Sequence, residues 1–400
     1  MKKICIDLRP LQIGHQNRGI GMYLKSVLEH LQPGNKYVFY CFNSGNPIEE
    51  MSISVPVPYT IISTTKLNTV IDSPKNLIDA IRLIYHRFGA LKSDKPDVFI
   101  QPDFALGLPR WHKTKTIVIG YDLIPLIYKH DYMPSISFVL NHTPGKKAKI
   151  KAVLRSIYYK FKYKVSYQVF KRADHVVCIS KSTRDSFEKE LCINSAKLES
   201  IPLAPVISME EPDQSILKKI TMPYVFYIGG TDSRKNVEDI VYAFNIARGR
   251  GLNLQLVLAG NEFVSAKTIP SHETREAISR SPYKKDIITI GFVSNAQKIA
   301  LYQSALAFIF TTLYEGFGLP VVEAMALSCP VISYSNSSIP EAAGNAGILV
   351  PTNDYVAVAE KVIELQSMND NQKEKIIASG QKQSSKFSWD NYAEKLQELF

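Results

Sequence analysis

Two glutamates, Glu315 and Glu323, stand on either side of a short loop that contains two glycines, and an apolar run ends just before them. Glycine lets the backbone approach a ligand closely. Pro320 suits the first turn of a helix, whose N-terminus would present N–H groups to an anion such as a diphosphate. The two carboxylates can then contact different parts of one ligand, for instance a sugar and a ribose. The alternative is a turn and an amphipathic helix with two solvated glutamates.

A basic pair, Arg234 and Lys235, follows the glycine turn Gly229-Gly230 behind another apolar run. We expect this pair to open a helix. A guanidinium fork and a lysine point charge at a helix N-terminus can stabilise a departing diphosphate. The alternative is an ordinary basic pair on a turn.

The first half of the chain offers weaker signals. Gly19 and Gly21 stand in Arg18-Gly19-Ile20-Gly21, which can cradle a phosphate or sugar through backbone N–H groups but is neither G-x-G-x-x-G nor a P-loop. Asp122 follows another apolar run and can contact a sugar hydroxyl; the alternative is a turn or N-cap aspartate.

Metal-binding patterns are missing from the sequence. It contains no Asp-x-Asp and no His, Cys and carboxylate cluster at metal-ligand spacing. We therefore expect no cofactor and no required metal. The charge of a leaving diphosphate would be neutralised by Arg234, Lys235 and helix dipoles.

Length and composition indicate a globular protein of two domains. The chain has 400 residues, 45% hydrophobic and 21% charged. Asp7 and Arg9 interrupt any signal-like apolar core near the N-terminus, and the uncharged stretch 299–314 is too short and polar to span a bilayer. The five cysteines form no Cys-x-x-Cys, which favours reduced thiols in a cytosol.

The positive charge is concentrated in the first half. Residues 1–200 carry 30 Lys and Arg against 16 Asp and Glu, a net of +14, whereas residues 201–400 carry 18 against 21, a net of −3. The stretch 146–172 holds ten basic residues and no acid, interleaved with aromatic residues. Such a basic amphipathic helix can lie on an anionic membrane. The alternative is a solvated helix that covers the core; no nucleic-acid-binding motif is present.

Strand and helix patterns alternate along both halves, which predicts an α/β protein with two doubly wound parallel sheets. A linker near 204–212 would join them, and ligands would bind at the carboxyl ends of the strands. The strands are expected at 3–8, 37–42, 97–101, 116–121, 175–180, 197–203, 224–228, 254–259, 287–290, 305–310 and 330–334. The helices are expected at 22–31, 181–191, 237–248, 296–302 and from about 319.

The order of these motifs resembles the retaining glycosyltransferases of family 4, in particular the mannosyltransferases of bacterial surface polysaccharides. The resemblance rests on Asp7-Leu8-Arg9 and the first glycine loop, Asp122-Leu123-Ile124-Pro125, the glycine turn with Arg234-Lys235-Asn236, the Glu315 to Glu323 block and Phe387-Ser388-Trp389. It implies the GT-B fold, with two Rossmann-like domains facing across a cleft. The domains would be 1–205 on the acceptor side and 206–385 on the donor side, with the helix in 386–400 crossing back to the first.

The resemblance also implies roles for single residues. Glu315, Arg234 and Lys235 would be catalytic, with Glu315 at the transferred sugar and the two cations at the diphosphate. Glu323 would bind the donor ribose. The other donor-binding positions would be Gly19, Gly21, Asp122, Gly230, Val293, Gly316, Phe317, Gly318 and Leu319. The chain departs from the family at Tyr121, where many members have histidine, at Gly230, where many have arginine, and at Ser328, which replaces a glycine.

The expected function is therefore metal-independent transfer of a hexose, with mannose favoured, from a nucleotide diphosphate sugar with retention. The acceptor would be a glycan, in particular a lipid-linked one, in polysaccharide or O-antigen (lipopolysaccharide) biosynthesis. The protein would be cytoplasmic and peripheral on the inner face of the membrane, held there by residues 146–172. The alternatives are a nucleotide-sugar epimerase of the same fold and a non-catalytic scaffold at the membrane surface.

Overall fold

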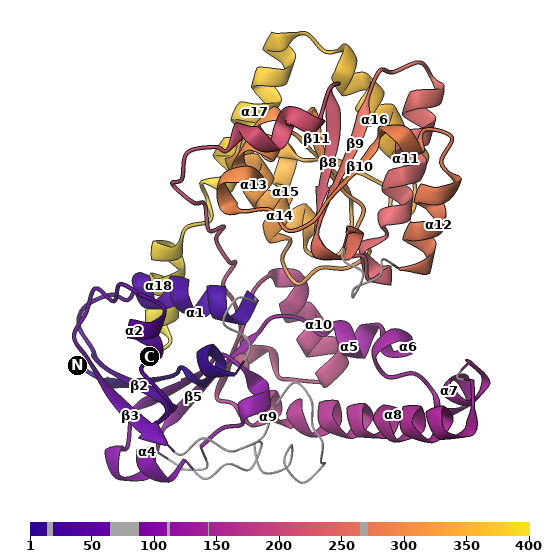
Figure 1. Ribbon diagram of the computed structural model, residues 1–400. Helices are drawn as coiled ribbons and strands as arrows, with labels where there is room; N and C mark the ends of the chain where they lie inside the picture. The colour runs from indigo at the N-terminus through magenta and orange to yellow at the C-terminus, as the bar shows by residue number, and fades with distance from the viewer. Residues whose placement is uncertain (14–18, 65–87, 110–112, 143, 265–270) are drawn as a thin grey trace. The chain divides into compact units, whose positions relative to one another are not determined.

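The computed structural model describes residues 1–13, 19–64, 88–109, 113–142, 144–264 and 271–400 (Figure 1). Its contacts divide the chain into two compact units. Unit 1 comprises Met1–Pro202 and Trp389–Phe400, and unit 2 comprises Leu203–Ser388. The divisions that we predicted from the sequence fall after residues 205 and 385.

Unit 1 is built on a parallel sheet of seven strands in the order β3-β2-β1-β4-β5-β6-β7. Its central strands are buried along almost their whole length, as expected where helices cover both faces of a parallel sheet. The strands are β1 (Lys3–Asp7), β2 (Lys36–Phe42), β3 (Tyr59–Thr64), β4 (Val98–Gln101), β5 (Lys115–Gly120), β6 (His175–Cys178) and β7 (Leu198–Ser200).

The helices of unit 1 are mostly short, apart from α1, α8, α10 and α18. The α-helices are α1 (Gly19–Glu29), α2 (Pro47–Glu50), α4 (Gly89–Asp94), α5 (Ile124–Ile127), α6 (Lys129–Tyr132), α7 (Ile136–His142), α8 (Lys146–Ser166), α9 (Gln168–Arg172), α10 (Lys181–Leu191) and α18 (Trp389–Glu398). The 3-10 helices are η1 (Arg9–Gln12), η2 (Phe104–Leu106) and η3 (Ser195–Lys197).

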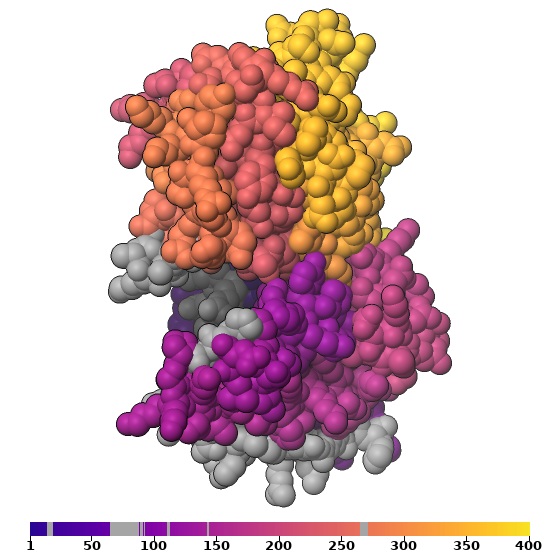
Figure 2. All heavy atoms as spheres, turned by 90° about the vertical axis from the view of Figure 1, so that its right-hand side faces the viewer, coloured from indigo at the N-terminus to yellow at the C-terminus, as the bar shows by residue number. Residues whose placement is uncertain are grey.

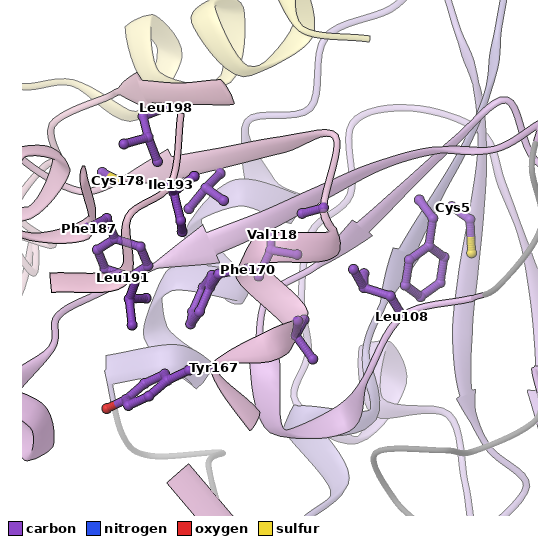
Figure 3. Packing of buried hydrophobic residues seen from close by; sticks show 14 of the residues in the cluster. Cys5, Leu108, Val118, Tyr167, Phe170, Cys178, Phe187, Leu191, Ile193 and Leu198 are labelled. Carbon is purple, nitrogen blue, oxygen red and sulfur yellow. The ribbon is translucent and has the colours of Figure 1, made fainter. Parts of the chain in front are cut away.

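A buried hydrophobic cluster joins the sheet of unit 1 to α9 and α10 (Figure 3). Phe170 and Phe187 pack edge to face with ring centroids 4.7 Å apart, and Leu191 at the end of α10 and Ile193 after it extend the cluster. Such packing fixes the positions of α9 and α10 against the sheet.

A buried ion pair lies at the carboxyl end of β1. Arg9 and Asp7 have fully buried side chains, and the guanidinium Nε and Nη2 donate to the carboxylate at 2.9 and 2.5 Å. Gln101 donates a further hydrogen bond to Asp7 at 2.9 Å, and the guanidinium lies 4.9 Å from the ring centroid of Tyr40. The Asp-Leu-Arg motif therefore has a structural role in the core of unit 1.

The last helix, α18, belongs to unit 1 although the chain before it belongs to unit 2. It packs on α1, where the Tyr392 hydroxyl donates to the Tyr23 hydroxyl at 2.9 Å. The Trp389 ring lies edge-on to Tyr23 with centroids 6.1 Å apart. These buried aromatic contacts hold the C-terminal helix in unit 1.

Unit 2 is built on a parallel sheet of six strands in the order β10-β9-β8-β11-β12-β13. From β8 the chain builds the sheet outward to one edge, and from β11 it builds outward to the other. Open α/β sheets bind ligands at such a switch point, here between β8 and β11. The strands are β8 (Tyr224–Ile228), β9 (Gln255–Ala259), β10 (Ile287–Ile290), β11 (Ala307–Phe310), β12 (Val331–Tyr334) and β13 (Ile348–Val350).

Helices cover both faces of this sheet, with α11, α12 and α16 on one side and α13, α14 and α17 on the other (Figure 1). The α-helices are α11 (Val237–Gly249), α12 (His272–Arg280), α13 (Asn295–Ser304), α14 (Leu319–Ala326), α15 (Ile339–Ala343), α16 (Tyr355–Ser367) and α17 (Asp370–Ser384). The 3-10 helices are η4 (Gln214–Lys219), η5 (Ser233–Lys235), η6 (Asn261–Phe263), η7 (Lys284–Asp286) and η8 (Gly344–Ala346).

The predicted α/β class with two doubly wound sheets is confirmed, but two strands were missed. β3 is an edge strand whose residues are all partly or fully exposed, so its sequence lacks a buried apolar run. β13 has three residues. The prediction of a single continuous helix over 146–172 is wrong. The segment forms two helices, α8 and α9, which are separated at Tyr167.

Candidate functional site

The candidate site lies in unit 2, at the carboxyl ends of the neighbouring strands β8 and β11. The loop after β8 carries Arg234 and Lys235, and the loop after β11 carries Glu315. A hydrogen bond from the Leu313 N–H to the Arg234 carbonyl, 2.7 Å long, ties the two loops together. Lys235 and Glu315, 80 positions apart in the sequence, therefore meet at the switch point of the sheet.

Glu315 joins both cations through one oxygen. Its Oε1 accepts from Lys235 Nζ at 2.5 Å, from Arg234 Nη1 at 2.8 Å and from Thr312 Oγ1 at 3.0 Å. The three charged side chains are only 13–14% exposed. The sequence singled out these three charged residues, and the structure shows them in direct contact.

The pKa of Glu315 reflects two opposing effects. Burial acts to raise it, but the positive charges of Lys235 and Arg234 and the hydrogen bonds from Lys235 and Thr312 together bring it below its ordinary value. Glu315 is therefore ionised and weakly basic. The pKa of Asp232, which pairs with Arg234 Nε at 2.9 Å, is raised because burial outweighs the attraction of the two cations.

The basic pair does not open an α-helix, contrary to our prediction. Arg234 and Lys235 lie in the 3-10 turn η5, and Asn236 separates them from α11 with φ +49°, in the left-handed region. Two interactions fix this turn: Thr311 Oγ1 donates to the Asn236 carbonyl at 2.8 Å, and Lys235 Nζ lies 5.1 Å from the Phe310 ring centroid. The two cations are thus held by β11 and its loop rather than by a helix terminus.

The backbone of Glu315 is fixed from a third element, the start of α15. Its N–H donates to Ser337 Oγ at 3.0 Å, and its carbonyl accepts from Ser338 Oγ at 2.9 Å. Ser337 has φ +46°, a conformation uncommon for a residue with a side chain. These serines were not predicted as site residues, although Ser338 immediately precedes α15.

The glycine loop 316–319 is largely buried up to the start of α14. Gly318 has φ +97°, and a Cβ atom there would lie 2.9 Å from Ile339 Cδ1, so this position requires glycine. The Phe317 ring is 2% exposed and packs edge-on against Phe387 with centroids 5.2 Å apart. The Phe317 side chain therefore belongs to the core, so only the backbone of this residue is available to a ligand.

Glu323, the second predicted carboxylate, lies on α14 and pairs with Lys298 on α13 at 3.1 Å. Burial raises the pKa of Glu323, and the charge of Lys298 only partly opposes this effect. Sequence reasoning missed Lys298, since a lysine in a helix carries no signal of its partner.

Val293, the position that the resemblance places near the base, stands in the loop between two elements of unit 2. This loop follows β10, which ends at Ile290, and precedes α13, which begins at Asn295. It therefore leads directly into the helix that carries Lys298.

The glycine turn after β8 is closely packed. Gly260 has φ +152°, and a Cβ atom there would lie 2.3 Å from the Gly229 carbonyl oxygen. The Tyr227 hydroxyl donates to the Gly230 carbonyl at 2.6 Å. Gly230, which stands where many family members have arginine, therefore contributes backbone alone, and the positive charge at this turn comes from Arg234 and Lys235.

The remaining predicted residues, Gly19, Gly21 and Asp122, lie in unit 1. Gly19 begins α1, and nothing lies within 4 Å of a Cβ atom built on it. Asp122 accepts a hydrogen bond from the Ile124 N–H at 2.9 Å, as a turn aspartate does. Tyr121 packs edge-on against Tyr23 with ring centroids 5.6 Å apart. Arg18, the first residue of the predicted glycine loop, lies outside the described residues.

Two further properties concern the whole described part of the chain. Within it, no three His, Cys, Asp or Glu side chains are grouped as metal ligands would be. None of the helices that the structure describes combines the length and apolar character needed to cross a bilayer. Metal independence and membrane association both stay predictions.

Comparison with known proteins relates unit 2 to one family. Residues 208–383 match the family described as glycosyl transferases group 1. O-antigen chain mannosyltransferase B of Escherichia coli is 31% identical over 170 residues, which cover 42% of this chain and 43% of the relative. Serotype-specific mannosyltransferase WbdA of Escherichia coli is 27% identical over 292 residues, 70% of this chain and 32% of the relative. The matches thus span less than half the length of these relatives.

Solved structures show the same fold over the whole chain. Sucrose-phosphate synthase from Thermosynechococcus elongatus superposes with a TM-score of 0.66 at 16% identity, covering 100% of this chain and 98% of that one. Anabaena Alr3699/HepE in complex with UDP and glucose gives 0.64 at 14% identity, covering 100% and 99%. The predicted GT-B fold and the resemblance to mannosyltransferase-like family 4 enzymes are confirmed.

Proposed function

Because residues 208–383 match the glycosyl transferases group 1, we propose that this chain transfers a hexose from a nucleotide diphosphate sugar to a glycan acceptor in bacterial polysaccharide synthesis. The observation that carries the proposal is the contact of Arg234 and Lys235 with Glu315 at the switch point of unit 2. A buried cationic pair suits a ligand whose negative charge increases during the reaction.

Arg234 and Lys235 would hold the diphosphate of the donor. Both side chains are largely buried, so they interact with an anion more strongly than solvated cations would. As the bond between the sugar C1 and the diphosphate oxygen breaks, negative charge builds on the leaving group beside them. Their contacts with Glu315 fix their positions, which lowers the cost of reorganisation during the reaction.

Glu315 is poorly suited to act as a nucleophile. Its Oε1 already accepts three hydrogen bonds, and its pKa lies below the ordinary value. We therefore assign it to orienting the two cations and contacting the sugar. The acceptor oxygen would form its bond to C1 on the face from which the diphosphate departs, and its proton would pass to a diphosphate oxygen. This route retains the configuration at C1.

Glu323 would bind the ribose. A carboxylate accepts hydrogen bonds from neighbouring hydroxyls, and Lys298, 3.1 Å away, favours its ionised form. Because burial raises the pKa of this carboxyl, the pair with Lys298 matters for keeping it charged. The lysine is therefore a positioning residue for the carboxylate.

Mannose is the sugar we propose, with GDP-mannose as donor. The support is the description of three relatives as mannosyltransferases, two of them of the O-antigen chain. The test is incubation of the purified chain with GDP-mannose, UDP-glucose and UDP-galactose and a polysaccharide acceptor, with product analysis by NMR. An α-linked product from an α-linked donor supports retention. Product formed from the donor alone would favour an epimerase, and loss of activity with a chelator would contradict metal independence.

The helix α8 supports binding to an anionic membrane. Its exposed apolar side chains recur every three or four residues, at Ile150 (63% exposed), Leu154 (62%), Ile157 (48%) and Phe161 (39%). This spacing forms a single stripe along the helix. Figure 1 shows α8 extending from the rest of unit 1 with α7 at its outer end. Figure 2 shows all atoms from the side on which this outer end of α8 lies.

Vesicle flotation tests this surface. We expect binding to phosphatidylglycerol vesicles at low salt, weaker binding to phosphatidylcholine, and loss of binding when Ile150 and Leu154 are both replaced by serine. Val356→Ser on α16, where the side chain is 40% exposed, is the matched control. Equal binding by the double variant would contradict the assignment of the stripe.

A further inference from the structure

Unit 1 contains a cavity of about 390 Å³ between α5, α6, α8, α9 and α10. Its volume falls in the range of roughly 300–1,000 Å³ that small-molecule sites occupy. The walls are mainly apolar, and they include Leu126, Met133, Tyr163, Tyr167 and Leu191. An apolar chain would therefore fit this cavity.

Positive charge surrounds the same cavity. Lys129, Lys160, Lys164 and Lys171 contribute to its lining, and Glu190 is the acidic residue among the lining side chains. Lys129, Lys164 and Lys171 are exposed, so their ammonium groups can reach an anion at the mouth. The combination of an apolar wall and several lysines fits an amphiphile with one apolar chain and a negatively charged head.

The Tyr167 hydroxyl gives independent evidence for a polar ligand. Tyr167 is 5% exposed, and its hydroxyl oxygen has no hydrogen-bond partner among the described residues. In Figure 3 this oxygen points away from Phe170 and Leu191 and out of the hydrophobic cluster. A buried hydroxyl without a partner is costly, and a ligand oxygen at this place would satisfy it.

We propose that this cavity binds the lipid phosphate of the acceptor, with the phosphate at Tyr167 and the lysines and the apolar chain against Leu126, Met133 and Leu191. Assigning the ligand to the acceptor rests on the proposed glycosyl transfer. The exposed stripe of α8 ends at Phe161, three residues before Lys164, so a lipid leaving a membrane at this stripe would reach the cavity directly.

Titration calorimetry of the full chain with octyl phosphate tests the proposal without any donor. We expect octyl phosphate to bind, and octanol or inorganic phosphate to bind at least about tenfold more weakly. Tyr167→Phe should weaken binding by about tenfold or more, as loss of a hydrogen bond to a charged group does. Its ligand-free melting temperature should not fall, because the hydroxyl has no partner to lose. Tyr158→Phe, on a half-buried tyrosine of α8, is the control.

Several outcomes would overturn the proposal: no binding of octyl phosphate, equal binding of inorganic phosphate or octanol, or unchanged binding by Tyr167→Phe. Equal binding of dioctanoyl phosphatidylglycerol would assign the cavity to a membrane lipid instead. Failure of the proposed function is distinguishable, because it would appear as loss of GDP binding or transfer while octyl phosphate still bound. With an active enzyme, Tyr167→Phe should raise KM for a lipid-linked acceptor and leave KM for GDP-mannose unchanged.

Discussion

Replacing Lys235 by alanine tests the candidate site most directly. Lys235 Nζ lies 2.5 Å from Glu315 Oε1, and its side chain is 13% exposed. Removing one preorganised electrostatic contact from a developing negative charge lowers kcat by roughly 10²–10³-fold, about 3–4 kcal/mol. Glu315 would keep its hydrogen bonds from Arg234 and Thr312, so the fold should persist.

The assay is steady-state transfer from GDP-mannose, with circular dichroism to confirm folding. Lys285→Ala removes an exposed lysine elsewhere in unit 2 and is the matched control. Glu323→Ala should lose activity to a similar extent, because it removes the proposed ribose contact. Near-normal turnover in both Lys235→Ala and Glu323→Ala would refute the site assignment.

Three further predictions concern stability. Asp7→Asn should cost about 3–5 kcal/mol in urea denaturation, because it leaves the Arg9 guanidinium buried without its paired carboxylate; a cost below about 1 kcal/mol would contradict this. Ser328→Gly should raise the melting temperature relative to Ser328→Ala, since Ser328 has φ +65°; equal melting temperatures would show that this backbone is not strained. The lowered pKa of Glu315 contributes stability above the unfolded carboxyl pKa, about 4.3, that is lost as the pH falls through the folded value. Glu315→Gln should flatten this acid limb of the stability curve, and an unchanged limb would count against it.

The sequence predicted the parts of the site that follow directly from strand order. Arg234 and Glu315 each stand a few residues after an apolar run, and parallel neighbouring strands bring such loops together. Lys298 and Ser337 could not be found in this way. Their contacts with Glu323 and Glu315 depend on how α13 and the start of α15 pack, and neither residue type is unusual in its place.

The basic segment 146–172 is a second example of a feature that the sequence predicted only in part. Its charge and aromatic content were evident, but the interruption at Tyr167 was not, and this tyrosine lines a cavity. Periodicity describes the face of a helix, whereas a cavity depends on the neighbouring elements α6 and α10. Lys160, Lys164 and Lys171 line this cavity, whereas the sequence presents all the lysines of the segment as one surface.

The distribution of charge leads to a last prediction, on salt. Residues 201–400 carry a net charge of −3, so the donor diphosphate would be held by the buried pair Arg234 and Lys235 rather than by a general positive field. Buried charges are screened little by salt, whereas the exposed lysines of α8 are screened strongly. Raising NaCl from about 50 to about 500 mM should therefore change the affinity for GDP only a few-fold and abolish flotation with anionic vesicles. Equal loss of both would show that the donor is held by solvated charges, which the burial of Arg234 and Lys235 argues against.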